Sequence, residues 1–153
     1  MGSNAQKRLV RTPKVYVRDS GLVHALLGIR GHEELLGHPV VGASWEGFMI
    51  ETVVEAVADS DARSWFYRSS AGAEIDLVLE FADGDRWAIE IKRSLAPKPS
   101  KGFFSGCEEI QATRRYVLYP GDDQYPIGSS VEVISLQALI TAILVRQIPL
   151  NPR

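Results

Sequence analysis

The segment between residues 73 and 92 constrains the fold most, because two stretches in which apolar and polar residues alternate flank a short turn. Residues 74–81 and 86–93 both follow the two-residue period of a β-strand, and the sequence Ala-Asp-Gly at 82–84 separates them. The pattern predicts a β-hairpin. One of its faces is apolar, whereas the other carries carboxylates and a lysine.

The length of the turn decides which charged side chains face each other. A three-residue loop over 82–84, with its glycine in the left-handed conformation, closes a hairpin with a bulge. This loop pairs Phe81 with Asp85, and counting back along both strands then sets Asp76 opposite Glu90. The two carboxylates would lie on one face of the sheet.

A two-residue turn at 83–84 is the alternative, and it sets Asp76 opposite Ile91. In the three-residue case, Lys92 lies diagonally across from Asp76. Opposed like charges destabilise a strand pair, and a shared cation removes that penalty. Oxygen ligands suit Mg²⁺ or Mn²⁺, and Lys92 can then orient a water or stabilise charge on a phosphate. A solvated face with a Glu90–Lys92 pair is the simpler interpretation.

Periodicity elsewhere predicts alternating helices and strands. We expect helices over 20–27, 45–58, 101–111 and 136–146, strands over 14–17, 63–69, 74–81, 86–93, 115–119 and 131–136, and loops over 30–42 and 120–130. Asp19 or Ser20 is a candidate cap of the first helix, Gly28 can end it, and Ser44 is a candidate cap of the second. The main part of the chain therefore reads as helix, three strands, helix and strand.

Glu46 lies on the apolar side of the helix predicted over 45–58. At about 100° per residue, the residues that share its arc are Trp45, Met49, Ile50, Val53, Ala56 and Val57. The other acids of this segment, Glu51, Glu55 and Asp59, fall on the opposite side. A carboxylate directed at the core needs a proton, a cation or several donors. Its place in the first turn also allows a local cap or a salt bridge.

Composition limits the class of protein. The chain has 153 residues, of which 45% are hydrophobic and 24% charged, as in a single globular domain. The formal net charge of −2 excludes a protein that grips nucleic acid by bulk electrostatics. Cys107 has no cysteine to pair with, so we expect it buried near Phe103 and Ile110 in a cytoplasmic protein. No apolar run is long enough to span a membrane.

The first residues, Met-Gly-Ser-Asn-Ala, look like an expression remnant. We expect 1–10 to be this remnant and a linker, 11–40 an N-terminal strand and helix extension, and 41–148 the main domain. His24, His32 and His38 lack the spacing of zinc ligands, so we expect them in loops or on the surface.

A helix with Glu46, then "EID" with Asp76 and, fourteen positions later, "EIK" with Glu90 and Lys92 resembles the PD-(D/E)XK nuclease superfamily. This chain has Ile75 where the motif's name places proline. The resemblance implies an α/β, restriction-endonuclease-like core, in which helices flank a central mixed sheet of about four to five strands.

A closer resemblance covers residues 11–140, through "PKVYVRDSGLVHALLGI", "WEGFMIETVVEAV", "FYRSSAGAEIDLVLE" and "AIEIKRS". These stretches are similar to the uncharacterised C-terminal domain that follows an AAA-type ATPase module in many bacterial and archaeal proteins. The chain has no G-x-x-x-x-G-K-[ST] sequence, so ATP hydrolysis is not assigned to it. The resemblance implies an N-terminal ATPase partner, oligomers formed through that partner, and DNA or RNA as substrate.

Residue by residue, the resemblance implies that Asp76 and Glu90 bind the metal and that Lys92 is the catalytic lysine. It makes Glu46 a further acidic ligand or water holder and the Ile91 carbonyl an additional ligand. Arg68, just before the site, is a candidate phosphate contact or an ordinary surface arginine. A module that keeps this fold but docks a partner without cutting is the alternative function.

Overall fold

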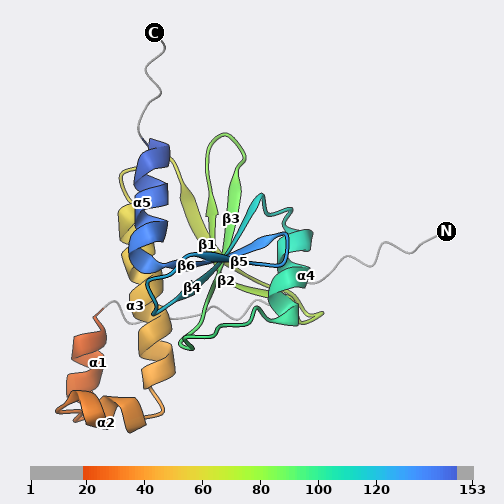
Figure 1. The fold of residues 1–153 in the computed structure, drawn as a ribbon. Coiled ribbons are helices and arrows are strands. Elements are labelled where there is room, and N and C mark those ends of the chain that lie inside the picture. The colour runs from red at the N-terminus through yellow and green to blue at the C-terminus, as the bar shows by residue number, and fades with distance from the viewer. Residues whose placement is uncertain (1–18, 148–153) are drawn as a thin grey trace.

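The computed structural model describes residues 19–147, which form one mixed β-sheet with helices on both faces (Figure 1). The helices are α1 (Ser20–Leu26), α2 (His32–Gly37), α3 (Val41–Ala56), α4 (Lys101–Glu109) and α5 (Leu136–Gln147). The strands are β1 (Arg63–Arg68), β2 (Glu74–Glu80), β3 (Arg86–Ile91), β4 (Arg114–Tyr119), β5 (Tyr125–Ile127) and β6 (Val131–Ser135). The strand predicted at 14–17 lies outside the described residues. No helix within 19–147 has the length and apolar character needed to cross a bilayer.

The six strands lie in the order β1-β2-β3-β4-β6-β5. The pairs β1–β2, β2–β3 and β5–β6 are antiparallel, whereas β3–β4 and β4–β6 are parallel. Helices α3 and α5 lie side by side on one face of the sheet, and α4 covers the other (Figure 1). A mixed sheet flanked by helices is confirmed, but it has one strand more than expected, because β5 forms inside the predicted 120–130 loop.

The hairpin of β2 and β3 has the register that the three-residue loop predicts. Leu77 pairs with Ile89, and the Phe81 N–H donates to the Asp85 carbonyl at 2.9 Å. Gly84 closes the loop with φ of 86°, a conformation that favours glycine. The two-residue alternative is therefore wrong.

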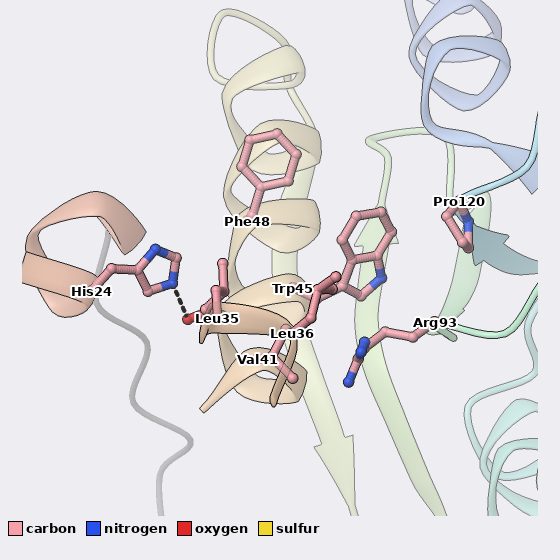
Figure 2. Close-up of a pocket in the computed structure, with 9 residues that line it drawn as sticks. His24, Leu35, Leu36, Val41, Trp45, Phe48, Arg93 and Pro120 are labelled. Atoms are coloured by element: carbon pink, nitrogen blue, oxygen red, sulfur yellow. Dashed lines mark hydrogen bonds between the residues drawn. The ribbon is translucent and has the colours of Figure 1, made fainter. Parts of the chain in front are cut away.

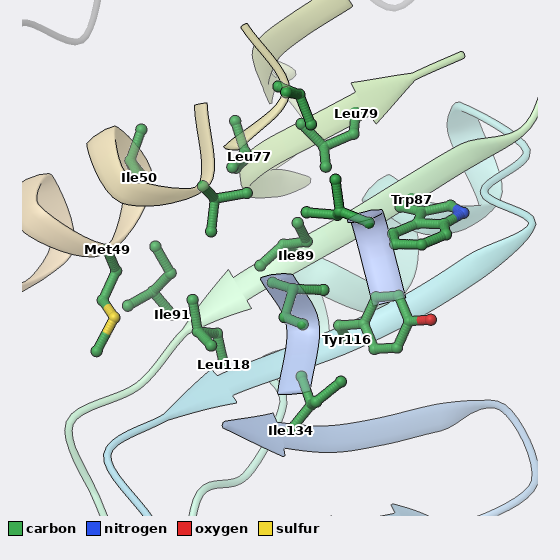
Figure 3. Packing of buried hydrophobic residues seen from close by; sticks show 14 of the residues in the cluster. Met49, Ile50, Leu77, Leu79, Trp87, Ile89, Ile91, Tyr116, Leu118 and Ile134 are labelled. Atoms are coloured by element: carbon green, nitrogen blue, oxygen red, sulfur yellow. The ribbon is translucent and has the colours of Figure 1, made fainter. Parts of the chain in front are cut away.

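Two hydrophobic layers hold the sheet between its helices. The layer under α3 and α5 contains Met49, Ile50, Val53, Leu77, Leu79, Trp87, Ile89, Ile91, Leu118, Leu139 and Ile143, much of it visible in Figure 3. The layer under α4 contains Ile75, Val78, Ala88, Phe103, Cys107, Ile110, Val117 and Val133. Cys107 is fully buried in this second layer, as expected.

A β-bulge interrupts the pairing of β2 with β1. Trp65 pairs with Val78 and Tyr67 with Ile75, so Asp76 and Leu77 together face one residue of β1. The bulge ends the strict alternation of β2. The two-residue period predicted for 74–81 places Ile75 and Leu77 on one face, but Ile75 lies in the α4 layer and Leu77 in the α3 layer.

The N-terminal helices differ from the prediction at several points. Asp19 does cap α1, since its Oδ1 accepts from the Leu22 N–H at 3.0 Å, and Gly28 follows the helix with φ of 72°. However, α2 lies within the predicted 30–42 loop, and α3 begins at Val41. Ser44 therefore lies inside α3 and is not its cap.

Candidate functional site

Asp76 lies in the bulge of β2, and its carboxylate crosses to β3. Its Oδ2 accepts a hydrogen bond from the backbone N–H of Ile91 at 2.9 Å. Regular pairing of the two strands ends at Leu77 and Ile89, and continuing that register sets Asp76 opposite Glu90. The side chain of Asp76 thus bonds to the end of β3 where the ladder stops.

Glu90 is a buried carboxylate, with 5% of the residue exposed. Its Oε1 lies 2.9 Å from Lys92 Nζ, and its Oε2 accepts from the Ser100 N–H at 3.0 Å. Lys92 is one-third exposed, so its ammonium faces both Glu90 and solvent. One cation and one backbone donor therefore compensate the buried charge, as burial of an ionised carboxylate requires.

The N-terminus of α4 supplies the backbone donor to Glu90. Ser100 is the N-cap of this helix, and its Oγ accepts from the Phe103 N–H at 3.0 Å. A glycine allows α4 to approach the segment before β2 closely, because a Cβ at Gly102 would lie 2.6 Å from the Gly72 carbonyl oxygen. The helix position and the contact to Glu90 are thus linked. A serine before a predicted helix is a cap signal that identifies Ser100, although sequence reasoning did not connect it to Glu90.

The remaining predicted site residues lie differently. Arg68 forms an exposed ion pair with Glu74 at 3.2 Å across β1 and β2. Glu46 is partly buried in the first half of α3, beside the buried Met49 and Ile50. In the described part of the chain, no three Asp, Glu, His or Cys side chains form a group that could hold a metal ion. The metal-binding and catalytic roles of all the predicted site residues stay predictions: Asp76, Glu90, Lys92, Glu46, Arg68 and the Ile91 carbonyl.

The donor set at the end of the hairpin fits a hard cation that retains water ligands. Mg²⁺ commonly uses one or two carboxylates and completes its octahedron with water and phosphate oxygens. Each carboxylate oxygen carries two lone pairs, so the bonds from Lys92 and Ser100 leave acceptor capacity on Glu90. Asp76, on the neighbouring strand, is the other carboxylate predicted to bind the cation.

Cys107 packs below the site, and its thiol is unreactive at neutral pH. Burial raises the pKa of its thiol to about 12, with Arg115 acting in the opposite direction and Glu90 adding to the increase. A thiol with so high a pKa is not a nucleophile at neutral pH. The thiol therefore adds no reactive group to the cluster of Asp76, Glu90 and Lys92.

A pocket of about 350 Å³ lies near the site and was not predicted from the sequence. Figure 2 shows its lining, which comes from α1, α2, α3 and the segments after β3 and β4: His24, Leu35, Leu36, Val41, Ser44, Trp45, Phe48, Arg93 and Pro120. Trp45 directly precedes Glu46, and Arg93 directly follows Lys92. No sequence periodicity reveals this pocket, because its walls come from segments far apart in the chain.

Fold and site together define a mixed α/β domain with a carboxylate–lysine cluster at the carboxyl end of β3. A family described as Domain of unknown function (DUF4143) matches residues 41–139, and the chain belongs to this family. It is 36% identical over 139 residues to "Uncharacterized protein Mb2031c" of Mycobacterium bovis and, equally, to "Uncharacterized protein Rv2008c" of Mycobacterium tuberculosis. These alignments cover 91% of this chain but 31% of each relative, so the chain spans about a third of their length.

One solved structure is also similar in part. It is the refined half-complex from a tetradecameric assembly of Thermococcus gammatolerans McrB AAA+ hexamers with bound McrC. The match covers 69% of this chain and 33% of that chain, with a TM-score of 0.43 and 11% identity. A similarity at this level carries no functional information.

Proposed function

We propose that this domain is a Mg²⁺- or Mn²⁺-dependent phosphodiesterase of restriction-endonuclease-like fold, which hydrolyses DNA or RNA in the cytoplasm. The observation that supports the proposal is the grouping of Asp76, Glu90 and Lys92 at the end of the hairpin. A buried glutamate beside a lysine, with a second carboxylate on the next strand, offers oxygen ligands to a divalent cation and a positive group to a phosphate.

Asp76 and Glu90 would hold the cation, with the Ile91 carbonyl and Glu46 as further candidate ligands. When bound, the cation would polarise the phosphoryl group and lower the pKa of a water molecule. In the hydrolysis, the water oxygen forms a bond to phosphorus, the bond from phosphorus to one sugar oxygen breaks, and a proton reaches that leaving oxygen. Asp76 and Glu90 would orient the reacting phosphate through the cation that they hold.

Lys92 has the location of a residue that acts on water or phosphate. Its ammonium carries three N–H donors and is one-third exposed, so donation to Glu90 leaves donors that can face substrate. It can hold the attacking water or stabilise charge on the phosphate oxygens.

We also propose that the domain works beside an AAA-type ATPase in a longer protein. The resemblance of residues 11–140 to such C-terminal domains supports this, as does the larger size of the relatives, of which the chain covers 31%. A net charge of −2 is low for a nuclease that must hold nucleic acid by itself. An ATPase module would supply additional contacts to the phosphates and the surface for oligomerisation.

Calorimetric titration with Mn²⁺ tests the metal site without a substrate. We expect binding by the wild-type chain, and at least tenfold weaker binding by Asp76→Asn and Glu90→Gln. Glu80→Gln is the matched control, because Glu80 lies on β2 but pairs with Arg86 at 2.7 Å, at the other end of the hairpin. Unchanged Mn²⁺ affinity in both site variants would refute the proposed ligands.

Cleavage of labelled oligonucleotides in Mg²⁺ or Mn²⁺ then tests catalysis. Lys92→Met should retain Mn²⁺ binding and lose at least a hundredfold in cleavage rate, since it removes a transition-state contact and no ligand. A Lys92→Met chain that cleaves like the wild type would exclude a catalytic lysine.

A non-cleaving docking module is the second candidate function. It is supported by three large apolar side chains on the surface of α1 and just after it: Leu22, Leu26 and Leu27, which are 53%, 79% and 49% exposed. Exposed apolar groups of this kind occur at protein–protein contacts. Metal binding without any cleavage, together with loss of a partner upon Leu26→Asp, would favour this function.

A further inference from the structure

The pocket beside the site combines apolar walls with donors for an anion. Its volume of about 350 Å³ lies in the range of small-ligand sites. Figure 2 shows Arg93 and Trp45 on one side and Phe48 on another, with leucines of α2 between them. Arg93 is exposed and forms no ion pair with another described residue. Its guanidinium is thus available to an anionic ligand.

The indole N–H of Trp45 points to the same ligand chemistry. This nitrogen is shielded from solvent and has no hydrogen-bond partner among the described residues. Buried donors without partners are rare and unfavourable. In Figure 2 the indole nitrogen lies on the edge of the ring that faces Arg93. A ligand phosphate would reach this nitrogen once the atoms that now cover it move aside, and it would then also face Arg93.

The opposite wall of the pocket suits a flat, apolar surface. Phe48 is 50% exposed and Leu36 is 49% exposed, although both are large apolar residues. Aromatic side chains of this kind stack on unpaired nucleobases in proteins that bind single strands. A base against Phe48 would cover apolar area that is otherwise in water.

The pocket is also joined to the site through two pairs of neighbouring residues. Trp45 and Glu46 are consecutive on α3, and Lys92 and Arg93 are consecutive after β3. The lining of the pocket is therefore one residue along the chain from two predicted site residues. A strand that passes Lys92 would next meet Arg93.

We propose that the pocket binds one unpaired nucleotide beside the phosphodiester that the site cleaves. Its base stacks on Phe48, and its phosphate accepts from Arg93 and the Trp45 N–H. The inference rests on the proposed nuclease function and restricts its substrates to single-stranded or locally unpaired nucleic acid. An apolar side chain of a protein partner would cover Phe48 but would leave the two donors without an acceptor.

Fluorescence anisotropy in EDTA tests the pocket without cleavage. The probes are a labelled oligothymidylate of about twelve nucleotides and a fully paired hairpin of similar length. We expect the single strand to bind more tightly, and Phe48→Ala or Arg93→Ala to weaken its binding by about fivefold or more, in line with the energy of one stacked base. The matched controls are Leu95→Ala and Lys98→Ala, which remove an exposed leucine and an exposed lysine outside the pocket. We expect less than about a twofold change from either.

A competition experiment distinguishes binding of the base from binding of the phosphate. Adenosine monophosphate should displace the oligothymidylate, whereas inorganic phosphate at the same concentration should not. Displacement by phosphate alone would overturn the stacking role of Phe48. Equal affinity for strand and hairpin, no measurable single-strand binding, or unchanged affinity in both pocket variants would each overturn the proposal.

These outcomes are distinct from failure of the nuclease function. Single-strand binding that depends on Phe48 in a chain that never cleaves would support the pocket and refute the nuclease. Cleavage that requires Asp76 but is unchanged in Phe48→Ala and Arg93→Ala would support the nuclease and overturn the pocket.

Discussion

The ion pair of Glu90 and Lys92 should contribute measurably to folding, unlike most ion pairs on a protein surface. Glu90 has a side chain only 7% exposed, Lys92 is 33% exposed, and their charged atoms lie 2.9 Å apart. Two unit charges about 4 Å apart attract by about 4 kcal/mol at an effective dielectric constant of about 20. Desolvation of the carboxylate and the exposure of the lysine offset much of this. We therefore expect a coupling free energy of about 1–2 kcal/mol.

A double-mutant cycle of Glu90→Gln and Lys92→Met measures this coupling. Lys92→Met alone should lower the free energy of unfolding by about 2 kcal/mol, because it leaves a buried carboxylate with only the Ser100 N–H. Glu90→Gln keeps an acceptor for Ser100 and should cost about 1–2 kcal/mol. The double variant should cost less than the sum of the two by the coupling energy.

Urea unfolding at neutral pH, followed by circular dichroism, provides the assay. The control cycle uses Arg68 and Glu74, whose side chains are 45% and 34% exposed, and its coupling should stay below about 0.5 kcal/mol. If the two cycles gave the same small coupling, Glu90 would not be held as a buried charge by Lys92. The proposal that Glu90 holds Lys92 in position to act on water or phosphate would then fail.

Three further predictions concern the scaffold. Gly102→Ala should lower the free energy of unfolding by about 1–3 kcal/mol in the same urea assay, because its Cβ would lie 2.6 Å from the Gly72 carbonyl oxygen. Gly42→Ala in α3 is the control, because its Cβ meets nothing within 4 Å, and it should be neutral or stabilising. Gly84→Ala should cost about 1–2 kcal/mol, because φ of 86° is unfavourable with a Cβ, and thermal unfolding will measure it. Burial raises the pKa of Cys107 from 9.0 to about 12, so its contribution to stability is complete below pH 9 and is lost as pH rises toward 12. Urea unfolding from pH 8 to 11 should show this loss in the wild type and less of it in Cys107→Ala; equal slopes would contradict the shifted thiol.

Local chemistry in the sequence predicts the hairpin and the ends of most elements. Gly84 fixes the loop, and the loop fixes the register that sets Asp76 toward the end of β3. That register brings Asp76 to the end of β3, where it contacts Ile91, whereas Glu90 and Lys92 share a face because they are two residues apart along the extended chain. The local sequence pattern was sufficient to predict the hairpin register, because the turn and both strands are adjacent in the chain.

Features that depend on distant packing were missed. Strand β5 is a three-residue edge strand with Pro126 at its centre, and it exists because β6 offers a partner. Helix α2 begins after Gly31, which provides no side-chain cap. The bulge at Asp76 and the bond from Ser100 to Glu90 require the docked α4, which no local pattern contains.

Because of the bulge in β2, a change of packing in either hydrophobic layer alters the direction of the Asp76 side chain. Ile75 must pack under α4, where a Cβ at Gly106 would lie 2.8 Å from its side chain, and Leu77 must pack under α3. Two residues separated by one position cannot face opposite sides in a regular strand, so the chain turns over at Asp76. The direction of this carboxylate is therefore set jointly by both hydrophobic layers. A larger residue at Gly106 or a smaller one at Ile75 would change the direction of the Asp76 side chain although neither change is made at Asp76 itself. The position of the Asp76 carboxylate therefore depends on correct packing of both hydrophobic layers.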